Sequence, residues 1–528
     1  MSLTFVKLSL RGSFSQRAFN TAVLLPDNWD DYGYKTSFSL TVYDGEGAAL
    51  LVGNVKIAYI GQVEGWSEDK VPDSFNRLSD DFYSLGQDAD YYQNLVNNLN
   101  PLVMHEILEA LGDVAYLPQR LHRAAQEKVF TSSLLRVVNH TTIVHQFTKI
   151  LRGEAPLTPY DFYYVKPPTD RSAGLRLDFS VKPDSKPSSN MHILIGRNGV
   201  GKTTILNSMI EALVSPSQEN FINGHFFKVH PWHTDSLIQQ DEFAGVVSVS
   251  FSAFDPFEPP PNQSDASAGM RYRYIGLKKK IGGNELWSWG LKTKDDLCTD
   301  LANSLSSCLA LQAKRFRWVN AIKKLESDYN FEEMNLLQLI DAYEADWSDS
   351  KDQFLTSSSK FFDRMSSGHA IVLLTITQLI ETVEERTLVL IDEPESHLHP
   401  PLLSAFTRAL SDLLTNRNAV AIIATHSPVV LQEVPKSCVS VISRTRLVAT
   451  VDSPESETFA ENVGALTRQV FGLEVNKSGF HELLALAVSN GMSFEEIEQQ
   501  YSGQIGNEGQ ALLRSLTISR DRNWESNK

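Results

Sequence analysis

The chain has 528 residues, of which 42% are hydrophobic and 21% charged, as expected for a globular protein with more than one compact unit. Its formal net charge of −16 argues against a protein that coats nucleic acid over its whole surface. Three cysteines without metal-ligand spacing, no basic-then-apolar leader and no apolar stretch near the roughly 20 residues of a membrane span predict a cytoplasmic protein without a membrane partner.

The N-terminal part, 1–170, is predicted to be β-rich and then helical. Alternating hydrophobic residues at 37–43 and 54–60 indicate two strands joined by a turn. From 79 to 152 the apolar residues recur with helical spacing. An aromatic segment then leads to a predicted strand at 174–180, in which Phe179 is assigned to the core in preference to stacking on adenine.

A glycine-rich motif, G-x-x-x-x-G-K-[ST], occupies 196–203 between a predicted strand at 191–195 and a helix that begins near 204. Its glycines turn backbone N–H groups toward phosphate oxygens, and the helix N-terminus adds partial positive charge. The side chain of Lys202 is expected to reach the outer phosphates, and Thr203 to ligate Mg²⁺. The predicted ATP-binding residues of this loop are Gly196, Asn198, Gly199, Gly201, Lys202, Thr203 and Thr204.

An apolar run at 387–391 ends in two acids, Asp392 and Glu393. It indicates a buried parallel strand that delivers carboxylates to the edge where open α/β sheets bind ligands. We expect Asp392 to hold Mg²⁺ through its water shell and Glu393 to polarise the attacking water. A core strand followed by an acidic turn is the alternative, but it leaves the glycine-rich motif in the same chain unexplained.

Two further motifs indicate the kind of ATPase. The segment 365–369 opens a predicted helix at 370–380 and resembles the LSGGQ signature of ABC-type ATPases. In such signatures the hydroxyl and N–H groups at the helix start bind the γ-phosphate held by the other protomer. A predicted strand at 421–425 ends in His426, which matches the switch histidine that contacts the γ-phosphate. The signature residues expected to bind ATP are Ser366, Ser367 and Gly368.

Three features near these motifs leave alternatives open. His397 and His399 lie at the D-loop position, where a dimer-contact loop is favoured over a metal site. No glutamine follows the strand predicted at 246–250, so the Q-loop ligand is open among Ser252, Asp255 and Gln240. The histidines His225, His230 and His233 lack the cysteine or paired acid that would complete a metal site.

The order of these motifs predicts an α/β fold, an ABC-ATPase-type P-loop NTPase head with a mixed sheet and a helical lobe inserted before the signature motif. Basic residues beside aromatics at 271–280 and 314–318 can hold nucleic acid, but acids follow the second stretch, which favours a solvated helix face with aromatics in the core. The expected parts are an N-terminal region at 1–170, a P-loop core with an arm at 171–290, the lobe at 291–362, a signature, Walker B and switch core at 363–450, and a C-terminal helical tail at 451–528.

Beyond the nucleotide motifs, the chain resembles the PtuA family, the ABC-type AAA family ATPases of Septu antiviral defence systems, which also occur with retrons. The similar stretches are 82–92, 250–257, 425–431, 461–467 and 478–481. The resemblance implies ATP hydrolysis with Mg²⁺, a homodimer or higher homo-oligomer, and control of an HNH-type nuclease subunit, PtuB-like. In retron-containing systems it also implies a reverse transcriptase with its RNA–DNA product.

Other function classes fit less well. A nuclease of the overcoming-lysogenisation type needs a C-terminal Toprim domain, but only about a hundred residues follow His426 and they contain no E…DxD set. A DNA-repair or SMC-like DNA-organising ATPase needs a long coiled coil, and no heptad run is present. A transporter motor would not have the long region before the P-loop. The C-terminal helices are expected either to hold the nuclease or to cap the ATPase core.

Overall fold

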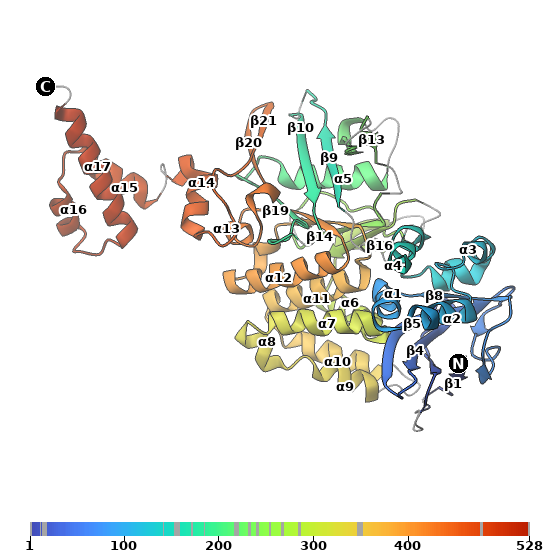
Figure 1. Ribbon diagram of the computed structural model, residues 1–528. Helices are drawn as coiled ribbons and strands as arrows, with labels where there is room; N and C mark the ends of the chain where they lie inside the picture. The colour runs from blue at the N-terminus through green and yellow to red at the C-terminus, as the bar shows by residue number, and fades with distance from the viewer. Residues whose placement is uncertain are drawn as a thin grey trace.

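The computed structural model shows three parts: an N-terminal sheet with helices, a central head, and a small C-terminal helical unit that projects from the head (Figure 1). The residues that it describes are 3–10, 12, 18–140, 142–152, 159–170, 173–183, 185–215, 221–230, 234–238, 242–252, 255–265, 269–282, 287–345, 352–475 and 479–525.

A six-stranded sheet with the order β7-β1-β2-β4-β5-β8 forms the N-terminal part. The predicted strands at 37–43 and 54–60 are confirmed, and they pair antiparallel as β4 and β5. The helical prediction from residue 79 is wrong at β8, which pairs with β5. The bounds are β1 (Thr4–Lys7), β2 (Thr21–Pro26), β4 (Ser37–Tyr43), β5 (Ala49–Tyr59), β7 (Ser74–Phe75) and β8 (Phe82–Gly86), with a separate pair of β3 (Tyr34–Lys35) and β6 (Gly65–Trp66).

Helices pack against this sheet and enclose a hydrophobic core of their own. Tyr91 and Tyr92 of the first helix are fully buried, and the Tyr92 hydroxyl donates to Asp113 Oδ2 at 2.9 Å. The helical elements are α1 (Ala89–Asn98), α2 (Pro101–Leu111), α3 (Pro118–Ala124), η1 (Phe130–Leu134), η2 (Thr142–Phe147) and α4 (Thr148–Leu151).

The head is built on a seven-stranded sheet with the order β15-β14-β18-β19-β11-β20-β21. All neighbouring strands are parallel except β21, which runs antiparallel to β20. The strands predicted before the P-loop, at the two acids and before His426 are confirmed as β11, β18 and β19. The bounds are β11 (Met191–Gly196), β14 (Gly245–Ser250), β15 (Tyr272–Gly276), β18 (Thr387–Asp392), β19 (Val420–Thr425), β20 (Val439–Thr445) and β21 (Val448–Asp452).

Both faces of this sheet are covered, because side chains of successive residues alternate between two cores. In β18, Val389 and Ile391 join the core on the helical side, whereas Leu388 and Leu390 join the core on the opposite side. The helical side holds α6 (Lys294–Ala310), α7 (Gln312–Leu325), α8 (Tyr329–Met334), α9 (Gln338–Ala345), α10 (Asp352–Asp363), α11 (Ser367–Thr382), η5 (Pro394–His397), α12 (Pro400–Asn416), α13 (Pro428–Leu431) and η6 (Lys436–Cys438).

On the opposite face, helix α5 packs beneath a four-stranded sheet with the order β10-β9-β12-β13 (Figure 1). Phe179 is buried in this core, so its assignment to core packing is confirmed. Strand β9 pairs with β10 along its whole length, so one hairpin crosses residue 170, where the sequence places a boundary. The bounds are β9 (Tyr160–Lys166), β10 (Leu175–Val181), α5 (Lys202–Val214), η3 (Phe221–Asn223), β12 (His225–Lys228) and β13 (Ser236–Leu237).

The two basic–aromatic stretches place most of their aromatic rings in the interior. Tyr272 and Tyr274 are buried in β15, and a hairpin of β16 (Lys278–Gly282) and β17 (Trp287–Leu291) follows. Trp318 in α7 is fully buried and donates to Thr377 Oγ1 at 3.0 Å. Phe316 alone of these rings is exposed, at 63%. The interpretation as core aromatics is therefore confirmed for the three buried rings.

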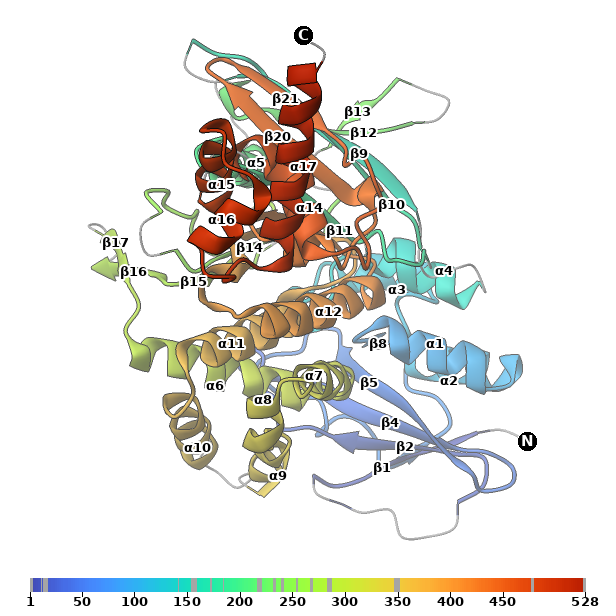
Figure 2. The same cartoon turned by 90° about the vertical axis from the view of Figure 1, so that its left-hand side faces the viewer.

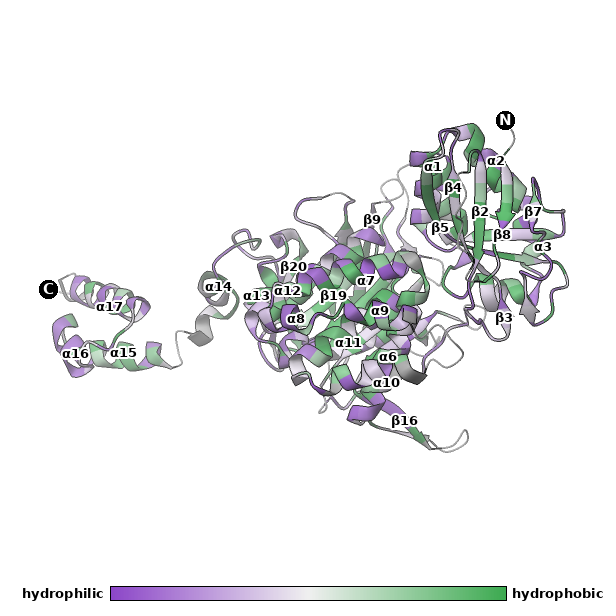
Figure 3. Cartoon of the chain, turned by 90° about the horizontal axis from the view of Figure 1, so that it is seen from below, coloured by the Kyte–Doolittle hydropathy of each residue, from purple (hydrophilic) through white to green (hydrophobic). Residues whose placement is uncertain are grey.

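The C-terminal helices α15 (Phe480–Ser489), α16 (Phe494–Gln500) and α17 (Asn507–Glu525) form a unit with a small core of Leu484, Val488, Ile497 and Leu513. A capping box of Ser493 and Glu496 begins α16. Figures 1 and 3 show this unit beyond α14 (Val463–Val475), at the end of the molecule opposite the N-terminal sheet, and Figure 2 looks onto the unit from that end. The alternative in which these helices cap the ATPase core is therefore wrong for α15–α17, whereas α14 does contact β11 and α13.

Among the helices that the structure describes, none has the length and apolar character needed to cross a membrane.

Candidate nucleotide-binding site

The P-loop lies between β11 and the N-terminus of α5, at the carboxyl edge of the parallel sheet. Gly199 and Gly201 have φ values of +81° and +97°, a region that residues with side chains seldom adopt. A Cβ at Gly196 would lie 2.2 Å from the carbonyl oxygen of Ile442 in β20, so the neighbouring strand requires glycine there. Asn198 and Thr204 are exposed beside these glycines. The loop thus leaves its backbone N–H groups and a helix N-terminus open to an anion.

Lys202 is buried and its ammonium group faces the loop and the switch histidine. Its Nζ donates to the carbonyl oxygens of Gly196 at 3.1 Å and Arg197 at 3.3 Å. It also lies 2.8 Å from His426 Nε2. Burial lowers the pKa of Lys202, while the nearby acids, Glu393 first, oppose that shift. These three acceptors engage all three N–H donors of the ammonium group, so phosphates bound in the loop would take donors from them.

His426 lies between the basic and the acidic side of the site. Its Nε2 is 2.8 Å from Lys202 Nζ and 3.2 Å from Glu393 Oε1. Lysine only donates and the carboxylate only accepts, so a ring with bare Nε2 accepts from Lys202 there, whereas a ring with Nε2–H donates to Glu393 and its Nδ1, 3.2 Å from Lys202 Nζ, accepts from the lysine. The ring can therefore change partners by changing tautomer or when a ligand occupies the lysine.

Asp392 ends β18 beside Thr203, with which it shares a hydrogen bond. Burial raises the pKa of Asp392 to about 7, and the Thr203 hydroxyl opposes that rise. The Oδ1 atom of Asp392 is buried without a hydrogen-bond partner. A buried carboxylate oxygen with no donor, next to a hydroxyl at a phosphate loop, has the chemistry of a hard-cation site. Asp392 and Thr203 therefore fit the Mg²⁺ role expected of them.

Glu393 follows directly, and its backbone has φ of +46°, which is uncommon for a residue with a side chain. Its N–H donates to the carbonyl oxygen of Ala424 at 2.9 Å, which fixes the turn against the end of β19. A cavity of about 30 Å³ beside Asp392, lined also by Asn207 and Asp255, has room for water. Glu393 does not line this cavity; its carboxylate instead faces His426, with Oε1 3.2 Å from Nε2 of that ring.

The signature motif lies on the helical side of the head. Ser366 caps α11, and Ser366 and Ser367 are exposed whereas Gly368 is buried. A Cβ at Gly368 would lie 2.5 Å from the carbonyl oxygen of His397, so the D-loop backbone packs directly on this glycine. The signature thus contacts the lobe and the D-loop, whereas the P-loop contacts β18 and the switch histidine.

Sequence reasoning missed two acids that bind side-chain or backbone groups of these motifs. Glu395 Oε1 accepts from the His426 backbone N–H at 2.5 Å, and its Oε2 is buried without a partner. Asp328, in the lobe, accepts from His369 Nε2 at 3.0 Å. An acid two residues after the Walker B pair is a signal that could have identified Glu395. Nothing in the sequence connects Asp328 with residue 369.

Of the three candidates for the Q-loop ligand, Asp255 lies close enough to Asp392 to raise the pKa of Asp392, after burial and Glu393. Gln240 lies outside the described residues. Of the three histidines considered as metal ligands in the sequence, His233 also lies outside the described residues. His225 and His230 join no metal-ligand group among the residues that the structure describes.

Comparison of the sequence with known proteins identifies a matching family and a relative of similar length. A family described as "AAA domain, putative AbiEii toxin, Type IV TA system" matches residues 269–432. The chain is 45% identical over 513 residues to protein ea59 of Escherichia phage lambda, covering 95% of this chain and 96% of ea59. The chain belongs to this family of AAA/ABC-type ATPases. Its fold, a parallel sheet with one strand, β19, between the P-loop strand and the acidic strand, is that of ABC-type P-loop heads.

Solved structures with low identity are also similar. The ADP conformation of MJ1267, an ATP-binding cassette of an ABC transporter, is 16% identical, with a TM-score of 0.31 over 60% of this chain and 98% of that chain. The SMC head domain from Thermotoga maritima is 12% identical, with a TM-score of 0.25 over 56% of this chain and 99% of that chain.

Proposed function

We propose that this protein binds Mg²⁺ and ATP at the P-loop and hydrolyses ATP in composite sites formed by two copies of the chain. The observation that carries the proposal is the unpartnered, buried Oδ1 of Asp392 beside Thr203, at the mouth of a glycine loop that contains Lys202. A bound Mg²⁺ would neutralise charge on the β- and γ-phosphates.

The chain's own residues supply the remaining chemistry. Backbone N–H groups of the loop and the N-terminus of α5 bind the phosphates, and Lys202 donates to the outermost ones. Glu393 accepts a proton from the attacking water as the bond to the γ-phosphorus forms. When phosphate oxygens take the donors of Lys202, Nε2 of His426 no longer has to accept from the lysine; in the tautomer with the proton on Nε2, the ring can donate toward the γ-phosphate.

A second copy is part of this proposal. Ser366 and Ser367 are exposed at the start of α11, and their motif contacts the lobe and D-loop of its own chain. Hydroxyl and N–H groups at a helix start attract a phosphate. A head-to-tail homodimer places each signature opposite the partner's P-loop, so that two ATP molecules lie between the two heads.

Replacing Lys202 by Ala is expected to weaken Mg²⁺–ATP binding by a factor of about 10 to 100, because the charge-assisted hydrogen bonds from the lysine to the phosphates are lost. Fluorescent ATP-analogue titration measures the change. The exposed Lys70→Ala variant is the matched control, and circular dichroism checks that both variants are folded. Unchanged affinity in Lys202→Ala would place the nucleotide elsewhere.

We further propose that the ATPase acts in an antiviral defence complex, where its nucleotide-dependent dimer state controls an HNH-type nuclease subunit. Two observations support this: the resemblance to the Septu ATPases, and the name of the matching family, which refers to a toxin of a type IV toxin–antitoxin system. A separate nuclease subunit is proposed because we identify no nuclease centre in the part of this chain that the structure describes. The described residues contain one cluster with metal-ligand character, and the residues after His426 contain no E…DxD set.

The C-terminal unit is the proposed docking site for that nuclease. Phe480, Leu483 and Leu486 of α15 are exposed at 46%, 57% and 59%, so among the described residues this face of the helix is largely open to solvent. Figure 3 colours much of α15 as hydrophobic. The unit keeps its own small core, so binding there would leave the head unchanged.

Deleting 479–528 is therefore expected to spare ATP affinity and the melting temperature of the head, and to abolish co-purification of a co-expressed nuclease subunit. The shorter deletion of 493–528 would expose Leu484 and Val488, so the cut before α15 is cleaner. A Leu483→Asp, Leu486→Asp variant tests the same face in the full chain. Full nuclease recovery with either variant would move the docking site to the helical lobe.

A further inference from the structure

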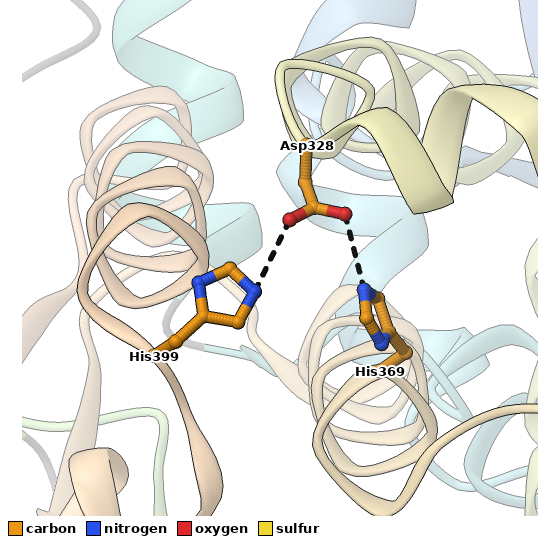
Figure 4. A group of neighbouring side chains, drawn as sticks. All are labelled: Asp328, His369 and His399. Carbon is orange, nitrogen blue, oxygen red and sulfur yellow. Dashed lines mark hydrogen bonds and ion pairs between the residues drawn. The ribbon is translucent and has the colours of Figure 1, made fainter.

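Three side chains from separate elements converge beside the signature motif (Figure 4). Asp328 caps α8 in the lobe, His369 lies in the first turn of α11, and His399 caps α12 after the D-loop. Asp328 Oδ1 is 3.0 Å from His369 Nε2, and Asp328 Oδ2 is 3.3 Å from His399 Nε2. One ligand atom from each of the three lies within 4.8 Å of the others. His397, the other D-loop histidine, is not a member.

We propose that Asp328, His369 and His399 bind a divalent transition-metal ion with the preferences of Zn²⁺. Two imidazoles and one carboxylate are a three-ligand set that Zn²⁺ accepts, with a fourth position left for water. Ligands about 2.0–2.1 Å from a tetrahedral ion lie roughly 3.3 Å apart. The two nitrogen–oxygen distances are of this size but end on different oxygens of Asp328, so the carboxylate would bind the ion with both oxygens or turn to place one of them between the two imidazoles. Asp328 and His369 are buried, whereas the His399 side chain is 49% exposed, which leaves an entry path.

A hydrogen-bonded partner stands behind one ligand, as metal-bound histidines require. His369 Nδ1 lies 2.5 Å from the hydroxyl oxygen of Ser366. If Nε2 binds the ion, Nδ1 carries the proton and donates to that oxygen. If Nε2 of His399 also binds the ion, its Nδ1 carries the proton and can no longer accept from the Leu402 N–H. That hydrogen bond is weak, because the two nitrogens are 3.4 Å apart, so little stability is lost.

The ion would reverse the hydrogen bond of the signature serine. Without it, His369 Nε2–H donates to Asp328, and Nδ1 accepts the proton of the Ser366 hydroxyl, which is then engaged within its own chain. With it, Nδ1–H donates to Ser366, and the serine keeps its own proton to donate to a phosphate oxygen of the partner. This consequence rests on the proposed function, whereas the metal site does not.

The site would also join the three elements that form one half of the composite ATP site. Asp328 belongs to the lobe, His369 to the signature helix and His399 to the segment after the D-loop. An ion that bonds all three fixes their relative positions before a partner arrives. We therefore infer that metal occupancy favours the ATP-dependent closed dimer.

Co²⁺ titration of the full-length protein without nucleotide tests the site, because tetrahedral Co²⁺ absorbs visible light. We expect one ion per chain, displaced by Zn²⁺. Asp328→Asn and His399→Asn should each weaken binding at least about 10-fold, because each removes a ligand. Asn is a good helix cap, so both variants keep the caps of α8 and α12. His397→Asn is the matched control and should bind as the parent does. No visible bands in the parent, or equal binding by His399→Asn, would overturn the site.

The coupling to Ser366 is tested separately in a Glu393→Gln background at constant Mg²⁺ and ATP. One equivalent of Zn²⁺ should increase the closed-dimer fraction, measured by light scattering, and His399→Asn should remove that increase. A dimer fraction that does not respond to Zn²⁺, in protein shown to bind Co²⁺, would overturn the coupling. A protein that binds Co²⁺ but not ATP would instead contradict the proposed function.

Discussion

Replacing Glu393 by Gln is expected to slow ATP hydrolysis by a factor of about 10² to 10⁴, the range for loss of a general base, with ATP affinity nearly unchanged. Glu393 Oε1 lies 3.2 Å from Nε2 of the His426 ring, and Glu393 follows the Asp392 that faces Thr203. Gln keeps the size of the side chain but accepts a water proton poorly. Phosphate release under single-turnover conditions measures the chemical step.

The same variant is expected to accumulate the closed dimer when ATP and Mg²⁺ are present, because the sandwich forms but does not turn over. Size-exclusion chromatography with light scattering reports the dimer. Adding Ser366→Ala should lower its amount, since the signature hydroxyl is lost. Glu508→Gln, on the exposed α17, is the matched control. Hydrolysis by Glu393→Gln at the parental rate would show that another group activates the water.

Replacing Asp31 by Asn is expected to destabilise the N-terminal part by about 3–5 kcal/mol, because it leaves a buried cation without its counter-charge. Lys56 Nζ lies 2.6 Å from Asp31 Oδ2, and both side chains are almost inaccessible to solvent. Ser133 and Trp29 also donate to this carboxylate, each at 2.8 Å. Burial lowers the pKa of Lys56, and Asp31 opposes that shift. Urea unfolding followed by tryptophan fluorescence measures the loss.

Two comparisons separate a charge effect from a packing effect. The double variant Asp31→Asn, Lys56→Met removes the buried charge together with its partner and should recover a large share of the stability. Asp178→Asn breaks an exposed pair with Arg176, and we expect a change below about 1 kcal/mol. If Asp31→Asn were as stable as Asp178→Asn, the buried pair would contribute little to this fold.

The candidate metal site illustrates why some functional residues escape sequence reasoning. His369 and His399 stand in recognisable motifs, but their partner Asp328 lies in the lobe, 41 residues before His369. In the sequence it is one acid among several in a charged stretch. Only the packing of α8 against the start of α11 makes that acid a ligand candidate. The same packing shows that His399, and not His397, belongs to the cluster.

The sequence by itself determined the P-loop, the acidic strand, the signature helix and the strand before His426. Each of these depends on local rules: glycines where backbone N–H groups turn toward an anion, and apolar runs of the length of a buried strand. Their order along the chain was enough to predict the type of head. These elements appear in the structure within a few residues of their predicted bounds.

The tertiary structure alone decided which distant segments meet. Strand β8 forms because β5 offers it a sheet edge, and β9 pairs with β10 across a segment that looks like a boundary. The C-terminal helices are as amphipathic as helices that cap a core, yet α15–α17 close a core of their own. Pairing and packing between remote residues leave no periodic signal in the sequence, because each partner is chosen by the geometry of the assembled fold.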